Sequence, residues 1–227
     1  TPYSESLVAA QNDEEFRKVL NEADFALPDG AGVLWAANRL GKKITERIPG
    51  REIFWDLCAL AESRGESIFL LGGFEDTPEA VAKKLKERFQ NIKIAGTYNG
   101  TPSLNPSHQW REKNGDSSSP LVGEVRRGDL VEIINSSGAS FLFVALGPIV
   151  QEKWIYHNFQ NLRAKLVMGV GGTFDYIAGK KPLPPRFLSS HGLEWLWRLF
   201  TQPKRIFRIS RGVLGLIWLV FRARLKN

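Results

Sequence analysis

The sequence has little of the residue types that cross-link a chain or hold a metal, with one cysteine and three histidines in 227 residues. A single thiol cannot build a disulfide framework or a multi-cysteine metal site, and Cys58, in the apolar stretch IFWDLCAL, is expected to be a buried structural residue. The histidines lack ligand spacing and no Asp-X-Asp motif occurs, so we expect neither a metal site nor a cofactor.

Long apolar runs are also absent. The apolar core of the last segment, Gly212 to Phe221, has ten residues, whereas a membrane-spanning helix needs about twenty. The opening run TPYSESLVAA lacks the basic and apolar regions of a secretory signal peptide. We therefore expect neither a signal peptide at the start of this sequence nor a spanning helix in its last segment.

Acidic residues become scarce toward the end of the chain. From Lys180 onward eleven Lys and Arg residues stand against Glu194 alone, whereas the preceding residues carry a net charge of −3. This asymmetry predicts an anionic partner for the tail: a phosphate, an acidic membrane surface or a nucleic acid. We place one globular domain at residues 1–181 and a basic amphipathic helical appendage at residues 182–227.

Helical and strand-like segments alternate along the first two-thirds of the chain. Strands are predicted at SIFLLGG, NIKIAGTY, ASFLFVALG and AKLVMGVGG, with helical patterns between them. This order predicts an α/β fold with a largely parallel, Rossmann-like sheet and helices on both faces. Residues 101–127 break the rhythm with Pro, Ser, Asn and Gly, and are either a tolerated insertion, which we favour, or a functional lid.

Ligands of such sheets bind beyond the carboxyl ends of the strands, where glycine-rich turns leave room. We expect four turns to line this rim: Pro28-Asp29-Gly30, Leu71-Gly72-Gly73, Leu146-Gly147-Pro148 and Gly169-Val170-Gly171-Gly172. The rim is therefore the predicted site of ligand binding.

The tail is predicted to contain an amphipathic helix. Arg205, Arg208 and Arg211 recur at three-residue spacing, which places them on one side of a helix, and apolar residues such as Leu214 and Trp218 follow. A basic side, an apolar side and tryptophan are typical of a helix that lies in a membrane interface. The alternative is a helix that docks on the domain with solvated arginines, and the two roles can coexist.

Four blocks, in order and spacing, resemble the signature blocks of the WecG/TagA/CpsF glycosyltransferase family. They are Pro28-Asp29-Gly30 with Glu46 to Gly50 (ERIPG), Ala145 to Trp154 (ALGPIVQEKW), Gly169 to Asp175 (GVGGTFD), and Leu193 to Leu199 (LEWLWRL) with Pro203 to Arg208 (PKRIFR). The resemblance covers essentially the whole chain except the 101–127 insertion. It implies inverting transfer of an N-acetylhexosamine-type sugar, such as N-acetylmannosamine or its uronic acid, from a UDP donor to a polyprenyl-diphosphate-linked N-acetylglucosamine, in bacterial cell-surface polysaccharide or teichoic acid synthesis.

The same resemblance implies that Asp29 is the catalytic base and that Thr1, in Thr1-Pro2-Tyr3, belongs to the catalytic residues. A carboxylate in a partly desolvated pocket suits proton removal, because burial raises its pKa toward the working pH. From the residues alone, the favoured interpretation of Asp29 is an N-cap of the helix that starts near Gly30. Tyr3 departs from the asparagine usual in the family, and Arg47 is expected to shape the site.

Donor contacts are expected around the last two glycine turns. Gly171 and Gly172 let backbone amides approach a diphosphate or uridine, although tight strand–helix packing explains them equally well. Gln151 and Glu152 are placed to bind sugar hydroxyls or uracil, unless Glu152 only complements the helix dipole. Asp175 is expected to shape the site rather than to catalyse.

Arg198, Arg205 and Arg208 are expected to stabilise the departing diphosphate in place of a metal, because planar guanidinium groups match its geometry. Anionic lipid headgroups are the alternative ligands of these arginines. We expect a UDP-sugar, a lipid-linked acceptor and the cytoplasmic face of the membrane as partners, with the protein peripheral there; homo-oligomerisation stays open.

Two competing functions remain. One is a membrane-associated module that binds a nucleotide-sugar but is catalytically impaired. The other is a nucleic-acid-binding protein, which is disfavoured because the apolar run 212–221 would then face water.

Overall fold

The computed structural model describes residues 1–99, 127–185, 187–188, 197 and 206–225. The chain forms two compact units, one of residues 1–52 with 182–227 and one of residues 53–181. These compact units group the first 52 residues with the tail. The functional division into a catalytic domain at 1–181 and an appendage at 182–227 stays a prediction. Apart from Arg127, the predicted insertion 101–127 lies outside the described residues.

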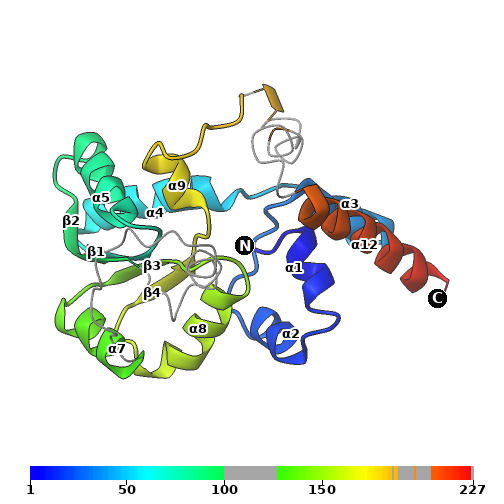
Figure 1. Ribbon diagram of the computed structural model, residues 1–227, viewed down its shortest axis with the longest axis horizontal. Coiled ribbons are helices and arrows are strands. Elements are labelled where there is room, and N and C mark those ends of the chain that lie inside the picture. The colour runs from blue at the N-terminus through cyan, green and yellow to red at the C-terminus, as the bar shows by residue number, and fades with distance from the viewer. Residues whose placement is uncertain (100–126, 186, 189–196, 198–205, 226–227) are drawn as a thin grey trace, which may run out of the picture. The chain divides into compact units, whose positions relative to one another are not determined.

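A four-stranded parallel sheet forms the centre of the 53–181 unit (Figure 1). The strands are β1 (Ser67–Gly72), β2 (Lys93–Tyr98), β3 (Phe141–Ala145) and β4 (Leu166–Gly169), in the order β2-β1-β3-β4. These strands are continuous apolar runs because both faces of the sheet are covered by helices. In β3 every residue is buried. The α/β class, the parallel sheet and all four predicted strands are confirmed.

Helices pack on both faces of this sheet. One face carries α4 (Gly50–Arg64), which begins in the other unit, together with α5 (Thr77–Arg88) and α9 (Thr173–Ile177). The other carries α7 (Arg127–Ser136) and α8 (Val150–Asn158), which is followed by the short 3-10 turn η1 (Phe159–Asn161). Their apolar sides form two separate cores, one on each face.

Aromatic rings fill the core beneath α4. The Phe54 ring lies edge-on to Phe143 and Phe174, with centroid distances of 4.7 and 6.0 Å. Cys58 is fully buried in the same cluster, and this burial raises the pKa of its thiol far above the usual range. The predicted burial of Cys58 is therefore confirmed.

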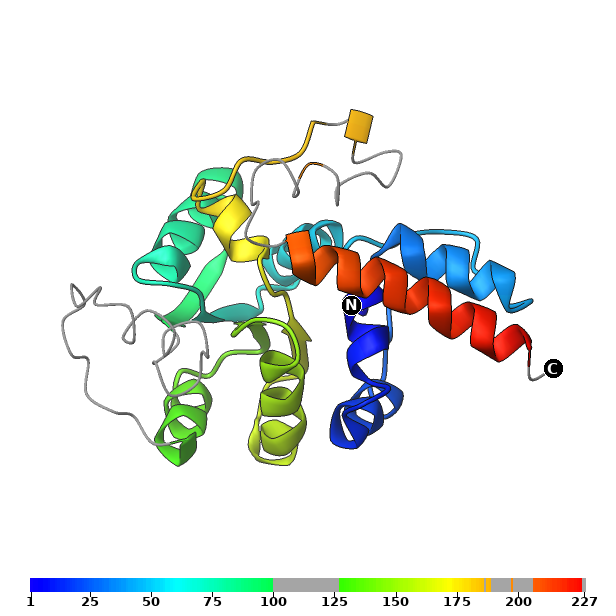
Figure 2. The ribbon, with the colours of Figure 1, turned by 45° about the vertical axis from the view of Figure 1, so that its right-hand side comes forward.

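The other unit is built from helices in its described part. These are α1 (Ser4–Ala9), α2 (Glu14–Asn21), α3 (Ala31–Arg39) and the long α12 (Ile206–Arg224). In both views α12 lies alongside α3 and against α1 (Figures 1 and 2). Ala36, Leu216 and Val220 form a small buried cluster there, flanked by Leu7 and Val8.

Helix α12 is apolar on two opposite sides. We call the buried side, with Gly212, Gly215, Leu216 and Val220, the inner face, since it packs on α1 and α3. The outer face consists of Leu214, Ile217, Trp218 and Phe221, which are 65, 47, 57 and 63 % exposed. Docking of the predicted helix is thus observed, while its membrane contact stays a prediction. In the described ranges, no helix combines the length and hydropathy needed to cross a membrane.

Candidate functional site

Three blocks that are distant in the sequence meet where α1 and α3 begin. The Asp29 N–H donates to the carbonyl of Pro2 at 3.3 Å, and the Ile48 N–H donates to the carbonyl of Pro28 at 2.9 Å. These backbone bonds hold the segment around Asp29 between the start of the chain and the ERIPG segment. The segments that the family resemblance singled out around Thr1, Asp29 and Ile48 are therefore neighbours within one compact unit.

Glycines allow this close approach. A Cβ at Gly50 would lie 3.0 Å from the Thr1 hydroxyl oxygen, and a Cβ at Gly30 would lie 3.3 Å from the Tyr3 Cβ. Side chains at either position would push the three blocks apart. Thr1 consequently lies directly against the start of α4, at the buried Gly50.

Asp29 is half-buried and precedes the first turn of α3. The N-cap position of that helix falls on Gly30, one residue later, so the N-cap alternative for Asp29 does not match the helix boundary. Arg47, also half-buried, directly precedes Ile48, whose N–H bonds the segment before Asp29. The structure thus brings Thr1, Asp29 and the backbone next to Arg47 into one neighbourhood.

Three of the four predicted turns lie together at the carboxyl edge of the sheet. The Gly73 N–H donates to Ala145 at 3.0 Å, and the Val170 N–H donates to Val144 at 2.8 Å, so the ends of β1, β3 and β4 are side by side. The fourth predicted turn, Pro28-Asp29-Gly30, lies in the other compact unit, so its place at this rim stays a prediction. No strand leads into Pro28-Asp29-Gly30 among the described residues, because the preceding apolar run DFALP has no strand to pair with and its Phe25 is exposed.

Gln151 ties two of these turns together. It is only 4 % exposed, and its side-chain oxygen accepts the Gly171 N–H at 2.9 Å. A Cβ at Gly169 would lie 2.9 Å from the Gln151 amide nitrogen, so glycine is required for this approach. Gln151 thus fixes the turn after β4 to the start of α8.

Glu152 closes the start of α8. One carboxylate oxygen accepts the Ile149 N–H at 2.6 Å, and the other accepts the Gln151 amide at 2.7 Å. Both oxygens are therefore engaged within the protein, which favours the helix-end interpretation over direct sugar binding. Ile149 has a φ of +70°, an unfavourable conformation for a β-branched residue, directly at this turn.

Open space remains beside two glycines of the rim. A Cβ at Gly147 or Gly172 would meet no atom within 4 Å, so a ligand can approach the backbone there. Helix α9 begins after Gly172 but has five residues, which limits the contribution of its dipole. Asp175 in α9 forms an ion pair with Lys181, consistent with a role in shaping this region.

The three tail arginines are not placed. Arg198 and Arg205 lie outside the described residues, and Arg208 is described only as part of the α12 backbone. Their contact with a diphosphate or with lipid remains a prediction. Within the described part of the chain, no three His, Cys, Asp or Glu residues gather into a potential metal site.

Two features were not anticipated from the sequence. The Tyr98 hydroxyl, at the end of β2, and the Trp154 indole N–H are buried and have no hydrogen-bond partner among the residues that the structure describes. Burial raises the pKa of Tyr98. A shallow, open cavity of about 630 Å³ lies over α5 and β2 and contains none of the predicted site residues. The lysines and glutamates that line this cavity are largely exposed. We therefore favour the glycine turns at the carboxyl edge of the sheet as the ligand site.

The family described as "Glycosyl transferase WecG/TagA/CpsF family" matches residues 1–227. The chain belongs to that family. A similar protein is the N-acetylglucosaminyldiphosphoundecaprenol N-acetyl-β-D-mannosaminyltransferase of Bacillus subtilis (strain 168), 31 % identical over 213 residues, which cover 92 % of this chain and 74 % of the relative.

Two further relatives of this WecG/TagA/CpsF member have the same name. The one from Staphylococcus aureus (strain MRSA252) is 27 % identical, with 88 % of this chain and 70 % of the relative aligned. The one from Bacillus spizizenii is 30 % identical, with 86 % of this chain and 68 % of the relative aligned. The family and these names identify a hexosyltransferase lineage.

Proposed function

We propose that this protein transfers N-acetylmannosamine, or a closely related N-acetylhexosamine, from a UDP donor to N-acetylglucosamine on a polyprenyl diphosphate. The observation that carries the proposal is the convergence of Thr1, Asp29 and the ERIPG segment at the starts of α1 and α3. The names of the relatives support the sugar and the acceptor. The glycine rim with open space at Gly147 and Gly172 supports a ligand that needs close backbone contact.

Asp29 is the base in this proposal. Its carboxylate takes the proton of the acceptor hydroxyl while that oxygen forms a bond to the anomeric carbon of the donor. The bond from the anomeric carbon to the UDP oxygen breaks, and UDP leaves with the electron pair. Attack opposite the leaving group inverts the anomeric centre.

Backbone amides and cations stabilise the leaving diphosphate. Gly171 and Gly172 contribute amides at the turn that Gln151 fixes, and the tail arginines contribute charge without a metal. Glu152 and Asp175 support this region through their bonds to Ile149 and Lys181. The outer face of α12, with nearby arginines, holds the protein at the cytoplasmic membrane surface beside its lipid-linked acceptor.

A transfer assay tests the proposal. The full chain is incubated with a panel of UDP-N-acetylhexosamines and a synthetic N-acetylglucosamine-diphospholipid, with and without EDTA. We expect a disaccharide-lipid product with UDP-N-acetylmannosamine, inverted at the anomeric carbon and formed equally in EDTA. Binding of UDP without any product from the whole panel would favour the catalytically impaired binding module instead.

Replacing the base gives the first mutational prediction. Asp29→Asn removes the proton acceptor at nearly constant size, so we expect kcat to fall about 10²- to 10⁴-fold with the thermal unfolding temperature maintained. The matched control is Asp13→Asn, which makes the same chemical change at the N-cap of α2, where Asp13 accepts the Phe16 N–H at 2.9 Å. Asparagine also caps helices, so this control should keep full activity. Undiminished kcat in Asp29→Asn rules out Asp29 as the base.

A further inference from the structure

The proposed catalytic blocks directly precede the first turns of α1 and α3, and α12 packs on both helices. Ser4 begins α1 directly after Thr1-Pro2-Tyr3, and Ala31 begins α3 directly after Asp29-Gly30. Both helices contribute residues that pack against the α12 inner face. The helix is therefore connected through two short elements to the segment around Asp29.

Gly32 is the point where the three helices meet. A Cβ at Gly32 would clash with the Ser4 hydroxyl and would lie 3.3 Å from the Leu216 Cδ2. Leu216 itself is buried, at 5 % exposure, on the inner face of α12. Gly32 lies three residues after Asp29, in the turn where the Val33 N–H bonds the Gly30 carbonyl at 2.9 Å. Displacement of α12 would consequently reach the turn that follows Asp29.

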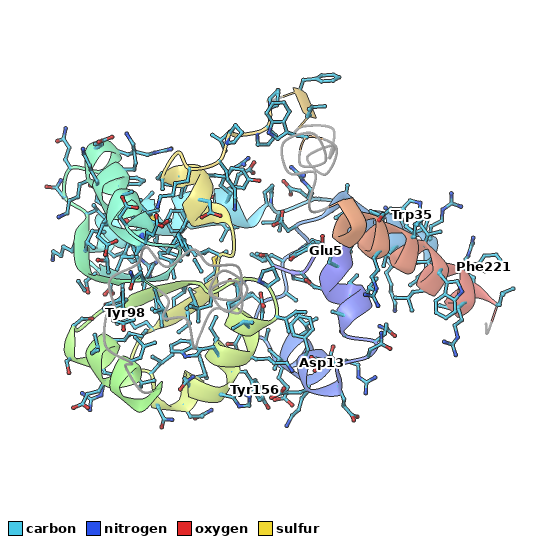
Figure 3. The ribbon with its side chains drawn as sticks, in the orientation of Figure 1. Glu5, Asp13, Trp35, Tyr98, Tyr156 and Phe221 are labelled. Carbon is cyan, nitrogen blue, oxygen red and sulfur yellow. The ribbon has the colours of Figure 1, made fainter. Side chains whose placement is uncertain are left out.

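Two glycines of α12 make the close approach to α1 possible. A Cβ at Gly212 would lie 2.6 Å from the Glu5 Cγ, and Glu5 lies on α1 beside α12 (Figure 3). A Cβ at Gly215 would lie 3.0 Å from both methyl groups of Val8. Glycine is a poor helix former, so its presence at both positions of a 19-residue helix needs a compensating reason. Close helix packing against α1 supplies that reason.

We propose that the inner face of α12 is a positioning element for catalysis: Gly212, Gly215 and Leu216 hold the starts of α1 and α3, and thereby Thr1 and Asp29, in the geometry that proton transfer requires. The inference rests on the proposed role of Asp29 as the base. Gly212, Gly215 and Leu216 act through the helices that they contact and touch no substrate. On this basis, loss of the tail lowers the catalytic rate even when the acceptor is supplied in detergent and no membrane is present.

Gly215→Ala tests the inference. Alanine favours a helix more than glycine does, so α12 itself is not weakened, while the new methyl group displaces α1 at Val8. In detergent with a soluble acceptor, we expect kcat to fall roughly ten- to hundredfold, because small displacements of a catalytic group have effects of that size. The KM for the UDP-sugar should change less than about twofold, since positioning of the base affects the chemical step.

Two comparisons separate positioning from general damage. Val8→Ala in the Gly215→Ala background removes the clashing methyl groups and should restore most of the lost kcat, which a simple loss of stability would not predict. Val213→Ala makes a comparable change at an exposed position of the same helix that belongs to neither face, and it should leave kcat in detergent unchanged. Gly212→Ala repeats the test against Glu5, which covers the case in which Gly215→Ala does not fold.

Hydrogen exchange gives a readout that does not depend on activity. Gly215→Ala should speed exchange of the Val33 and Leu34 amides, which bond the Gly30 carbonyl, and Val8→Ala should reverse this. Full kcat in both glycine variants, or a loss of kcat that Val8→Ala does not reverse, overturns the positioning role. If the wild-type chain transfers no sugar at all, the proposed function fails, and unchanged exchange at these amides then overturns the positioning role separately.

Discussion

Individual side chains in this protein act mainly by holding turns. Gln151 bonds the Gly171 amide across twenty residues of sequence, and Glu152 uses both carboxylate oxygens at the start of α8. The sequence identified both residues as donor ligands, but it contained no signal for these internal partners, because partners this distant become neighbours only when β4 and α8 have packed. Asp29 could be proposed as the base from its block alone, since a local motif is visible without the fold, and that role stays a prediction.

Cys58 offers a clean residue-scale measurement because it is the one cysteine of the chain. Its raised pKa and complete burial keep it as an unreactive thiol in the native state. We expect its reaction with a thiol reagent at mildly alkaline pH to be at least about a hundredfold slower than in denaturing guanidinium chloride, because reaction requires opening of the core. Cys58→Ala provides the reagent blank. Equal rates in the two conditions would contradict the burial.

At the scale of elements, the turn before α8 holds a strained residue. Ile149 has a φ of +70°, which costs a β-branched residue about 1 kcal/mol or more and costs glycine almost nothing. Ile149→Gly is therefore expected to raise the free energy of unfolding by up to about 1 kcal/mol in a urea titration. Val150→Gly, one residue later within the helix, is the matched control and should lower it by a similar amount. A lower stability for Ile149→Gly would show that its side-chain contacts outweigh the strain.

The outer face of α12 gives a second prediction at this scale. Trp218 and Phe221 are more than half exposed, and the Arg222 guanidinium lies 5.2 Å from the Trp218 ring. Trp218→Ser and Phe221→Ser should each weaken binding to anionic lipid vesicles about tenfold in a flotation assay, since each removes apolar surface that enters the interface. Ile133→Ser on α7, also an exposed apolar position, serves as control. Equal vesicle binding by all three variants would exclude the outer face from membrane contact.

Elements that depend on local sequence patterns could be predicted, whereas features that depend on contacts between distant segments could not. Apolar runs predicted all four strands, and glycines end three of them, because both the run and its end are local patterns. The tail was predicted to have one apolar side, whereas α12 has two, because Gly212 and Gly215 become part of a surface only against α1. A strand was also expected to end at Pro28-Asp29-Gly30, after the apolar run DFALP. A strand needs a neighbouring strand to pair with, and this requirement is not a local pattern.

At the scale of the whole molecule, the two units differ in how they depend on the tail. The two cores of the sheet contain residues only from the 53–181 unit, whereas Ala36 and its neighbours are buried by Leu216 and Val220. A chain ending at residue 181 should therefore keep slow hydrogen exchange in β1 and β3 but lose protection in α1 and α3. Trp218→Ser, which alters only the outer face, should keep slow hydrogen exchange both in β1 and β3 and in α1 and α3. Full protection of α3 in the shortened chain would show that α1 and α3 fold without α12.

The packing of α12 on α1 and α3 also imposes an order on biosynthesis. Residues 1–52 are translated before the sheet unit, yet the helix that covers their apolar side is translated only after it. Closing a loop over such a separation costs conformational entropy, and domains made earlier fold while synthesis continues. The sheet can therefore fold before the segment around Asp29 is covered, and we expect Asp29 to reach its final position only after α12 has been translated.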